Sequence, residues 1–234
     1  MTNENFSDQM TVLLNSFNSK AAFGDAASVT EVVLDEYEKS VFLTMAQDEI
    51  VVNLYNGNNI YGDSFENTEE MRRYLEELVK TATCDTSTGS EIEPGSVFYT
   101  LPDDVAFIVY EQVTFNDSSL GCFNGNIASV YPVTHDEYNK IRKNPFRGPT
   151  KFKVLRLDVG ENKVELVSKY AFKDYFIRYI SKPRPIILED LPDGLTINGE
   201  SAESSCQLNS VLHDTILKRA VQLALASKGI QARS

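Results

Sequence analysis

Apolar residues recur at helical spacing in two segments of the first third of the chain. Residues 6–17 are predicted to form an amphipathic helix, with Ser7 or Asp8 as its N-cap. The apolar face of this helix is expected to contain Phe6, Met10, Leu13, Leu14 and Phe17. A further helix is predicted from Asn67, where Glu70 completes a capping-box pattern. The side chains expected to be buried in that helix are Met71, Leu75, Leu78 and Val79.

The longest helical pattern lies between these two segments and ends at Gly57. Two capping-box patterns compete for its start, one beginning at Ser28 and one at Asp35. We favour Asp35 because the β-branched residues before it resist helix formation, and residues 29–34 form either a short strand or a helix start. The broad apolar face of the helix is predicted to consist of Tyr37, Val41, Met45, Ala46, Ile50 and Leu54.

The middle of the chain is rich in β-branched and aromatic residues, and apolar and polar residues alternate along it. Residues 81–95 are rich in Thr, Ser and Gly and are predicted to be a loop at an internal domain boundary. Gly160-Glu161-Asn162 is typical of a hairpin turn, and Pro102-Asp103-Asp104 of a turn between two other strands. Pro183 and Pro185 favour a sheet edge for the last strand. The predicted strands are residues 95–101, 105–115, 127–133, 151–159, 163–168, 176–180 and 185–188.

Two further helices are predicted, one between two of the strands and one after the last strand. Thr134 and Glu137 form a capping pattern for a short helix limited by Pro145, and residues 209–227 have the apolar stripe of a closing helix. That stripe contains Leu212, Ile216, Ala220, Leu223 and Ala224. The predicted class is α+β, with an N-terminal helical layer, a mostly antiparallel sheet or sandwich, and a C-terminal helix. The corresponding regions are residues 1–83, 96–208 and 209–229, with the last helix packing back on the first region.

Acidic residues are concentrated in the first part of this 234-residue sequence, whose formal net charge is −12. Residues 1–100 contain 18 acidic and five basic side chains, whereas residues 101–234 contain 16 and 17. Such an acidic surface would repel nucleic-acid phosphates, so sequence-specific binding of DNA or RNA is not expected. The longest apolar stretch, residues 105–110, is far shorter than the about 20 residues of a membrane span. The first twenty residues also lack a secretory signal pattern.

The residue types that usually carry enzyme chemistry form no recognisable arrangement. His135 lies in a helix-capping sequence and His213 is expected to be exposed or next to a cap, so neither is predicted to bind metal or transfer protons. The three cysteines are widely spaced, which predicts reduced, structural side chains in an intracellular protein. Paired carboxylates such as Asp103-Asp104 are typical of surface charge, and a carboxylate-dependent hydrolase is kept as the alternative. No cofactor or metal is expected.

Basic side chains that could bind a partner are concentrated in two segments of the chain. The first is interleaved with an Asn-Pro-Phe sequence and the second with prolines. Solvated loops are the simpler interpretation, and docking loops for an acidic protein surface are the alternative. A chain with one acidic and one neutral part is suited to head-to-tail packing into a ring. The candidate docking residues are Lys140, Arg142, Lys143, Phe146 and Arg147 in the first segment, with Lys182 and Arg184 in the second.

Six segments distributed along most of the chain resemble known sequences. They are LDEYEKSVFLTMAQDEIV at 34–51, PVTHDE at 132–137, NPFR at 144–147, YISKPRPIIL at 179–188, CQLN at 206–209 and LHDTILKRAV at 212–221. These segments resemble, in the same order, structural proteins of crAss-like tailed bacteriophages. The resemblance carries no catalytic residues.

The resemblance implies a virion structural protein of the head–tail connector, or adaptor, type and not an enzyme. In that class a ring of about twelve copies matches the portal, with the helical region docking on the portal and the β-rich region facing the tail. Its partners would be copies of itself, the portal protein and neighbouring ring or tail proteins, with genomic DNA passing through without sequence-specific binding. It would assemble in the host cytoplasm and reside at the head–tail junction of the virion. The alternatives are the hydrolase and a monomeric phage-encoded protein-binding module.

Overall fold

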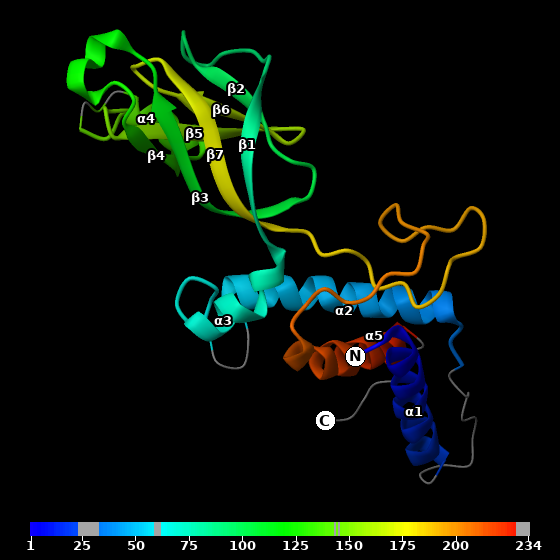
Figure 1. Cartoon of the computed structure of the whole chain (residues 1–234). Helices are drawn as coiled ribbons and strands as arrows, with labels where there is room; N and C mark the ends of the chain where they lie inside the picture. The colour runs from blue at the N-terminus through cyan, green and yellow to red at the C-terminus, as the bar shows by residue number, and fades with distance from the viewer. Residues whose placement is uncertain (23–32, 59–61, 143, 145, 228–234) are drawn as a thin grey trace. The chain divides into compact units, whose positions relative to one another are not determined.

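The computed structural model describes residues 1–22, 33–58, 62–142, 144 and 146–227, with the side chains of residues 17–22 excluded. The chain divides into two units, whose elements are labelled in Figure 1. A helical unit combines Met1–Leu78 with Lys182–Ser234, and a barrel unit consists of Val79–Ser181. The barrel is therefore inserted in the sequence of the helical unit. This division differs from the expected regions, because residues 182–208 belong with the helices and not with the strands.

The helical unit is built around its longest helix, α2, with α5 packed against it and α1 packed against α5. Phe6 and Met10 of α1 are buried, as the helical spacing predicts, while Leu13 is half-buried and Phe17 lies outside the described side chains. In α5 the stripe of Ile216, Ala220 and Ala224 is buried, together with Leu225 in place of the expected Leu223. The helices are α1 (Asn3–Ala22), α2 (Glu36–Asn56), α3 (Glu69–Tyr74) and α5 (His213–Ser227), with short 3₁₀ turns η1 (Glu76–Leu78) and η3 (Ser210–Leu212).

Local hydrogen bonds set where the helices begin and end. The capping box at Asp35 is confirmed, and Gly57 ends α2 with a φ of 78°, a left-handed conformation that glycine adopts without strain. The predicted start of α1 is wrong, because Thr2 accepts a bond from the Asn5 amide and the helix begins at Asn3. The cap of α3 is Thr68 and not Asn67, and that helix ends at Tyr74.

The predicted buried face of α2 is partly wrong. Met45 is about half exposed, and Tyr37 and Val41 are only half-buried. Polar side chains occupy the buried positions of α2. Ser40, Thr44 and Gln47 bond the backbone of residues 182–209, a segment called the strap below, whereas Lys39 donates to Ser7 and Glu36. The fully buried or nearly buried polar residues of α2 are Lys39, Ser40, Thr44 and Gln47.

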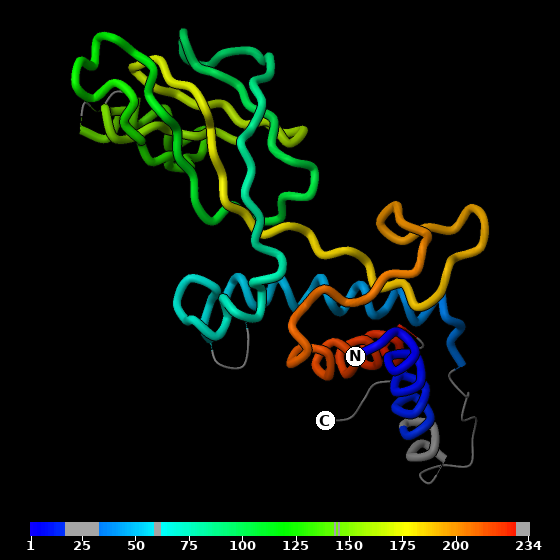
Figure 2. The backbone as a smooth tube through the Cα atoms, in the orientation of Figure 1, coloured from blue at the N-terminus to red at the C-terminus, as the bar shows by residue number. Residues whose placement is uncertain are grey.

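Figure 2 shows the strap, in yellow and orange, following α2. The Ser40 hydroxyl accepts a bond from the Leu188 amide at 3.0 Å, and the Thr44 hydroxyl accepts one from the Ile186 amide at 3.0 Å. Gln47 donates to the Arg184 carbonyl oxygen at 2.7 Å. The strand predicted at residues 185–188 is therefore wrong, because α2 side chains bond the backbone that a neighbouring strand would otherwise pair. Outside the named strands the strap forms an isolated bridge between Ile187 and Ser204.

The barrel unit is a closed seven-stranded barrel, with the strand order β1-β2-β6-β5-β4-β3-β7. The pairs are antiparallel except for β4 with β5, so the expected mostly antiparallel sheet is found, but it closes on itself and is not a sandwich. Closure pairs β1 with β7, two strands from the opposite ends of the unit. The strands are β1 (Val79–Ser87), β2 (Val97–Thr100), β3 (Val105–Phe115), β4 (Ile127–Pro132), β5 (Lys153–Gly160), β6 (Lys163–Val167) and β7 (Phe172–Ser181).

Most of the predicted strands are found, including the hairpin of β5 and β6 around Gly160. The loop predicted at residues 81–95 is wrong in its first half, because β1 occupies 79–87 and pairs on both sides, with β2 and β7. Its threonines are β-branched and suit an extended backbone once partners are present. For the same reason Val79, expected in a helix, begins a strand.

Side chains alternate between the barrel interior and an outer face that a short helix covers. The interior cluster includes Val113, Val154 and Tyr175. On β5 the intervening residues Leu155 and Leu157 point outward and pack with Tyr138 and Ile141 of the helix. That helix is α4 (His135–Ile141), and its predicted cap is confirmed, since the Thr134 hydroxyl accepts from the Glu137 amide at 3.2 Å.

Candidate docking surfaces

The first predicted basic segment lies on the barrel unit, at the end of α4 and in the turn that follows it. Because Tyr138 and Ile141 are buried against β5, Lys140 and Arg142 are left on the exposed side of the helix. Burial and the nearby Glu93 raise the pKa of Tyr138 to about 12, so its hydroxyl stays a neutral donor to Glu93. These contacts fix the position of the basic segment on the barrel.

The charged groups of this segment are only loosely paired within the barrel unit. Arg142 lies 3.0 Å from a Glu93 carboxylate oxygen, and Arg147 lies 3.8 Å from Glu137. Both arginine side chains are more than half exposed, so the pairs are solvent-screened and contribute little stability. The predicted Lys143 lies outside the described residues. The described cations of this segment are thus accessible to a partner.

Phe146 is the most exposed large hydrophobic side chain of the described residues, at 93% of its full accessibility. The turn that presents it is held by Asn144, whose side-chain oxygen accepts from the Phe146 amide at 3.0 Å. The Asn144 carbonyl oxygen also accepts from the amides of Arg147 and Gly148. An apolar ring exposed to water at a hydrogen-bonded turn is a feature of protein contact surfaces.

A group of exposed and half-buried aromatic rings and lysines, called the aromatic–cationic cluster below, lies beside this turn. Its members are Phe123, Tyr131, Lys151, Phe152 and Lys153. The Lys151 ammonium lies 3.7 Å from the centroid of the Phe123 ring, and Phe123 meets Phe152 edge-on. The Lys153 ammonium, 5.0 Å from the Tyr131 centroid, also donates to the Arg147 carbonyl oxygen at 3.3 Å, which joins the cluster to the turn.

Sequence reasoning did not find this cluster. Its members come from residues 118–123, β4 and the start of β5, which are brought together by the parallel pairing of β4 with β5. The alternation of Lys151, Phe152 and Lys153 was the available signal in the sequence.

The second predicted basic segment, Lys182 and Arg184, belongs to the helical unit and not to the barrel. The backbone of Arg184 is held on both sides, by Gln47 at its carbonyl oxygen and by Gln207 at its amide. Its side chain is mostly exposed and lies 3.9 Å from Glu200. The two basic segments therefore lie on different units, and the second one is part of the strap that stabilises α2.

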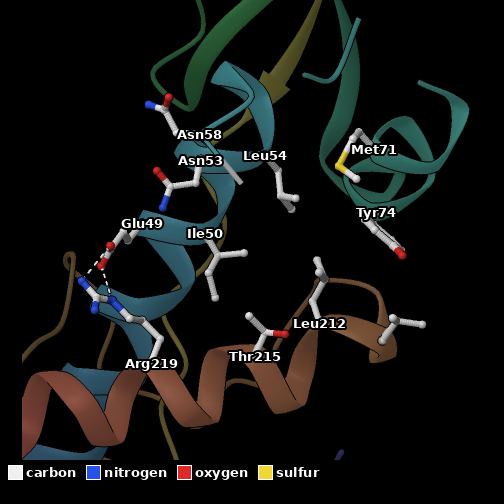
Figure 3. Close-up of a pocket in the computed structure, with 11 residues that line it drawn as sticks. Glu49, Ile50, Asn53, Leu54, Asn58, Met71, Tyr74, Leu212, Thr215 and Arg219 are labelled. Atoms are coloured by element: carbon white, nitrogen blue, oxygen red, sulfur yellow. Dashed lines mark hydrogen bonds and ion pairs between the residues drawn. The ribbon is translucent and has the colours of Figure 1, made fainter. Parts of the chain in front are cut away.

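The helical unit contains a pocket of about 400 Å³ between α2, α3 and α5. Figure 3 shows Ile50 and Leu54 from α2, Met71 from α3 and Leu212 from η3 around its interior. Asn53, Asn58, Thr215 and Tyr74 also line it, with the exposed Val211. At one side Arg219 donates two hydrogen bonds of 2.8 Å to Glu49, and this ion pair links α5 to α2. The pocket is an apolar depression with a polar margin.

The two units differ strongly in net charge. The helical unit carries 21 acidic and 10 basic side chains, a net charge of −11, whereas the barrel unit carries 13 and 12, a net charge of −1. Acidic residues of α3 include Glu69 and Glu70, and Glu70 accepts a bond from the pocket residue Tyr74. Charge is thus segregated between units of one chain, which favours attraction between the basic barrel segment and an acidic helical unit.

The barrel interior contains one buried polar network. Glu111 accepts bonds from Arg156 and from the Tyr175 hydroxyl, the latter at 2.6 Å. Burial raises the pKa of Glu111, and Arg156 and Tyr175 offset only part of this effect. Since the side chains of Glu111 and Arg156 are about nine-tenths buried, a substrate has no access to the network. It fixes strands across the barrel and does not form a catalytic site.

The histidines and cysteines form no candidate chemical centre within the described residues. No group of three or more His, Cys, Asp or Glu side chains there is arranged to hold a metal ion. His135 contacts the Asp158 carbonyl oxygen. His213 is buried against that of Leu208, so of the two expected alternatives exposure is wrong, whereas a position at a cap is confirmed, since His213 caps η3 and begins α5. The cysteines, free as expected, include Cys84 in the barrel core, where burial raises its pKa to about 12. None of the described helices is long and apolar enough to cross a membrane.

Taken together, a small barrel with an exposed aromatic and basic surface, joined to an acidic helical unit, defines a protein that works by contact with other macromolecules. The sequence comparisons give the family. A family model described as "Phage tail ring protein 3/4" matches residues 1–234, and the chain belongs to that family.

Two related proteins come from Bacteroides phage crAss001. The chain is 52% identical over 231 residues to "Ring protein 3" of that phage, covering 97% of this chain and 96% of the relative. It is 32% identical over 234 residues to "Ring protein 4/5", covering 95% and 91%. The chain is therefore a structural ring protein of the crAss-like phage type and not an enzyme, and the expected resemblance is confirmed.

Proposed function

We propose that this chain assembles head to tail into a homo-oligomeric ring of about twelve copies between the capsid portal and the tail. The observation that carries the proposal is the segregation of charge, −11 on the helical unit and −1 on the barrel unit. When two different surfaces of identical chains bind each other, each added copy leaves one free surface of each kind, so a further copy can bind. The assembly closes into a ring when the rotation between neighbouring copies brings the last copy back to the first. The barrel segment around Arg142 and Arg147 would meet the acidic helical unit of the next copy.

We infer the partners above and below such a ring from the two relatives. One phage encodes two proteins that both match this chain over more than nine-tenths of its length. We infer that rings of this family stack on one another, so that a second family member is a neighbour of this chain. The helical unit would meet the portal side and the barrel the tail side, at the head–tail junction of virions assembled in the host cytoplasm.

Genomic DNA would pass through the ring without sequence-specific binding. An acidic lining repels phosphates, whereas a basic lining would hold DNA through the release of counterions. The acidic side chains of the helical unit, with Glu4, Asp8 and Glu77 exposed, suit such a lining.

Counting copies tests the ring. Peptides of this chain are quantified by mass spectrometry in density-gradient-purified particles, relative to the major capsid protein. The proposal predicts a steady value of about a dozen copies per particle. Hundreds of copies would indicate a capsid decoration or tail-tube subunit, and absence from washed particles would overturn the structural role at the junction.

Charge reversal tests the DNA channel separately. Phage carrying Glu4→Lys, Asp8→Lys and Glu77→Lys should package or eject DNA more slowly, because cations on the lining retain phosphates. The matched control reverses three exposed acids of the barrel, Asp136, Glu161 and Asp174. Equal ejection kinetics in the two triple variants and the parent would contradict the channel lining while leaving the ring itself intact.

A further inference from the structure

Two features are left open to solvent by the described residues of their own units. One is the ring of Phe146, almost completely exposed on the barrel unit, and the other is the apolar pocket between α2, α3 and α5 of the helical unit. Fully solvating a phenyl ring is unfavourable, and aromatic side chains are the usual anchors of protein interfaces. The hydrogen bond from the Phe146 amide to the Asn144 side chain restrains the backbone that carries this ring, which lowers the conformational entropy lost when the ring is buried.

The pocket has the size and lining for one aromatic ring. A cavity of about 150 Å³ lined by aliphatic side chains is large enough for benzene, and this pocket measures about 400 Å³. Ile50, Leu54, Met71 and Leu212 are nearly buried at its base, and Met71 offers a polarizable sulfur of the kind that packs well against ring edges. In Figure 3 these side chains surround the open centre of the pocket.

The charges beside the two features are complementary. Arg147 follows Phe146 directly, and Lys140 and Arg142 are exposed on the preceding helix. At the pocket, the hydroxyl of the lining residue Tyr74 donates to Glu70, which brings a carboxylate to the margin. Glu69 is also exposed on α3, where it pairs with the equally exposed Arg73 at 2.8 Å in a solvent-screened contact, within a unit of net charge −11. An arginine next to the inserted ring would therefore approach acidic side chains.

We propose that Phe146 of one copy inserts into the α2–α3–α5 pocket of the next copy, with Arg147 meeting the acidic margin formed by Glu69 and Glu70. The occupant of the pocket is thus a second copy of this chain, and the contact is the repeating interface of the ring. This inference rests on the proposed function, since it specifies the residues by which neighbouring ring copies bind. An anchor and a complementary pocket on different units of each chain give the head-to-tail contact that a ring requires.

The test keeps the aromatic anchor in place. The full chain is produced with a diazirine-bearing phenylalanine at position 146, mixed with copies of the chain that carry heavy nitrogen, and irradiated. Mass spectrometry then identifies which heavy peptides have been cross-linked, so that only contacts between different copies are counted. The expected cross-linked peptides contain Ile50–Leu54, Met71–Tyr74 or Val211–Thr215.

Two controls distinguish insertion from proximity. In the first, the photoreactive residue is placed at Val159, which is about half exposed at the opposite end of β5 and should give no pocket peptides. In the second, the heavy copies carry Thr215→Trp, which fills the pocket from an exposed helical position, or Thr215→Ser, which leaves it open. Tryptophan should lower the pocket cross-links about tenfold or more, whereas serine should leave them unchanged.

Circular dichroism of the Thr215 variants excludes a loss of folding as the cause. Cross-links from position 146 that fall outside the pocket, an absence of pocket cross-links, or equal yields with tryptophan and serine would overturn the contact. A count of about a dozen copies in particles without pocket cross-links would retain the proposed function and remove this interface. Pocket cross-links with an incompatible copy number would retain the interface and remove the position at the portal.

Discussion

The barrel is held together by hydrogen bonds between backbones, whereas the strap of the helical unit is held mainly by hydrogen bonds from side chains. In the barrel, every strand pairs with two neighbours, and closure through β1 and β7 leaves no open edge. In the helical unit, the strap is held on α2 largely by side chains, with Ser40, Thr44 and Gln47 bonding its main chain. The barrel is a contiguous stretch of chain, whereas the helical unit joins two stretches that the barrel separates.

This difference determines how each unit responds to a single substitution. A closed backbone ladder tolerates the loss of most surface side chains, and its sensitive point is the interior ion pair. The strap instead depends on individual hydroxyl and amide groups, whose loss leaves buried backbone groups without partners. Substitutions of interior polar residues should therefore act locally, each on its own unit, and hydrogen exchange read peptide by peptide can separate the two responses.

The largest effect is expected in the barrel. Arg156→Met should destabilise the barrel by about 3–5 kcal/mol, because it leaves the Glu111 carboxylate buried without its cation. Hydrogen exchange of peptides from residues 79–181 should quicken, while peptides of α2 stay protected. The double variant Glu111→Gln/Arg156→Met is the control and should recover most of the loss, because it removes the buried charge and keeps an acceptor for the Tyr175 hydroxyl. Equal destabilisation by the single and double variants would contradict a specific role of the pair.

In the helical unit, Thr44→Val tests the bonds between α2 and the strap. The substitution keeps the shape of the side chain but leaves the Ile186 amide without its acceptor, which should cost about 1–3 kcal/mol. Exchange should quicken at residues 184–188 and not in the barrel. Thr11→Val is the matched control, because the Thr11 hydroxyl is exposed and bonds only the Ser7 carbonyl oxygen within α1. Similar effects of the two substitutions would contradict the role of the strap.

A smaller effect is expected from the cap of α2. Asp35→Ala removes the acceptor of the Glu38 amide, a bond of 2.7 Å, and should destabilise the helical unit by about 1 kcal/mol. Urea unfolding followed by far-ultraviolet circular dichroism measures the change. Asp8→Ala, at the position that the sequence pattern suggested as a cap, should leave the unfolding midpoint almost unchanged because Asp8 lies inside α1. A larger loss from Asp8→Ala would reverse this assignment.

The smallest effect concerns pH. Burial raises the pKa of Glu111 above its ordinary value of 4.5, so the folded barrel binds this proton more tightly than the unfolded chain does. The contribution of Glu111 to stability must then decline as pH rises from about 4.5 through the raised pKa. Relative to Glu111→Gln, the parent protein should lose barrel protection across that interval. A gain in relative protection with rising pH would show that the pKa is lowered instead.

The sequence predicted elements whose side-chain pattern is local. The capping box of Asp35, the cap of α4 at Thr134 and the hairpin around Gly160 were all readable, because each depends on residues only a few positions apart. The closure of the barrel was not, since the pairing of β1 with β7 joins residues about 100 positions apart and alternation alone does not select it. The buried polar face of α2 was missed because serine, threonine and glutamine are assigned to solvent unless their distant partners are known.

The same distinction applies to the candidate docking surfaces. Phe146 and its neighbouring cations were found because they are adjacent in sequence. The pocket was not, because its lining comes from α2, α3 and the segment of Val211–Arg219. The aromatic–cationic cluster requires the parallel pairing of β4 and β5, which no local pattern indicates.

The central claim, that this chain forms a ring at the head–tail junction, is tested most directly by imaging the portal vertex of purified particles. An electron cryo-microscopy reconstruction of that vertex, calculated without imposed symmetry, is compared with the separate structures of the helical and barrel units. We expect a single closed ring of about twelve copies between portal and tail, with the barrel of each copy against the helical unit of the next. Density that fits these units only in the tail tube, on the capsid surface, or nowhere in the particle would contradict it.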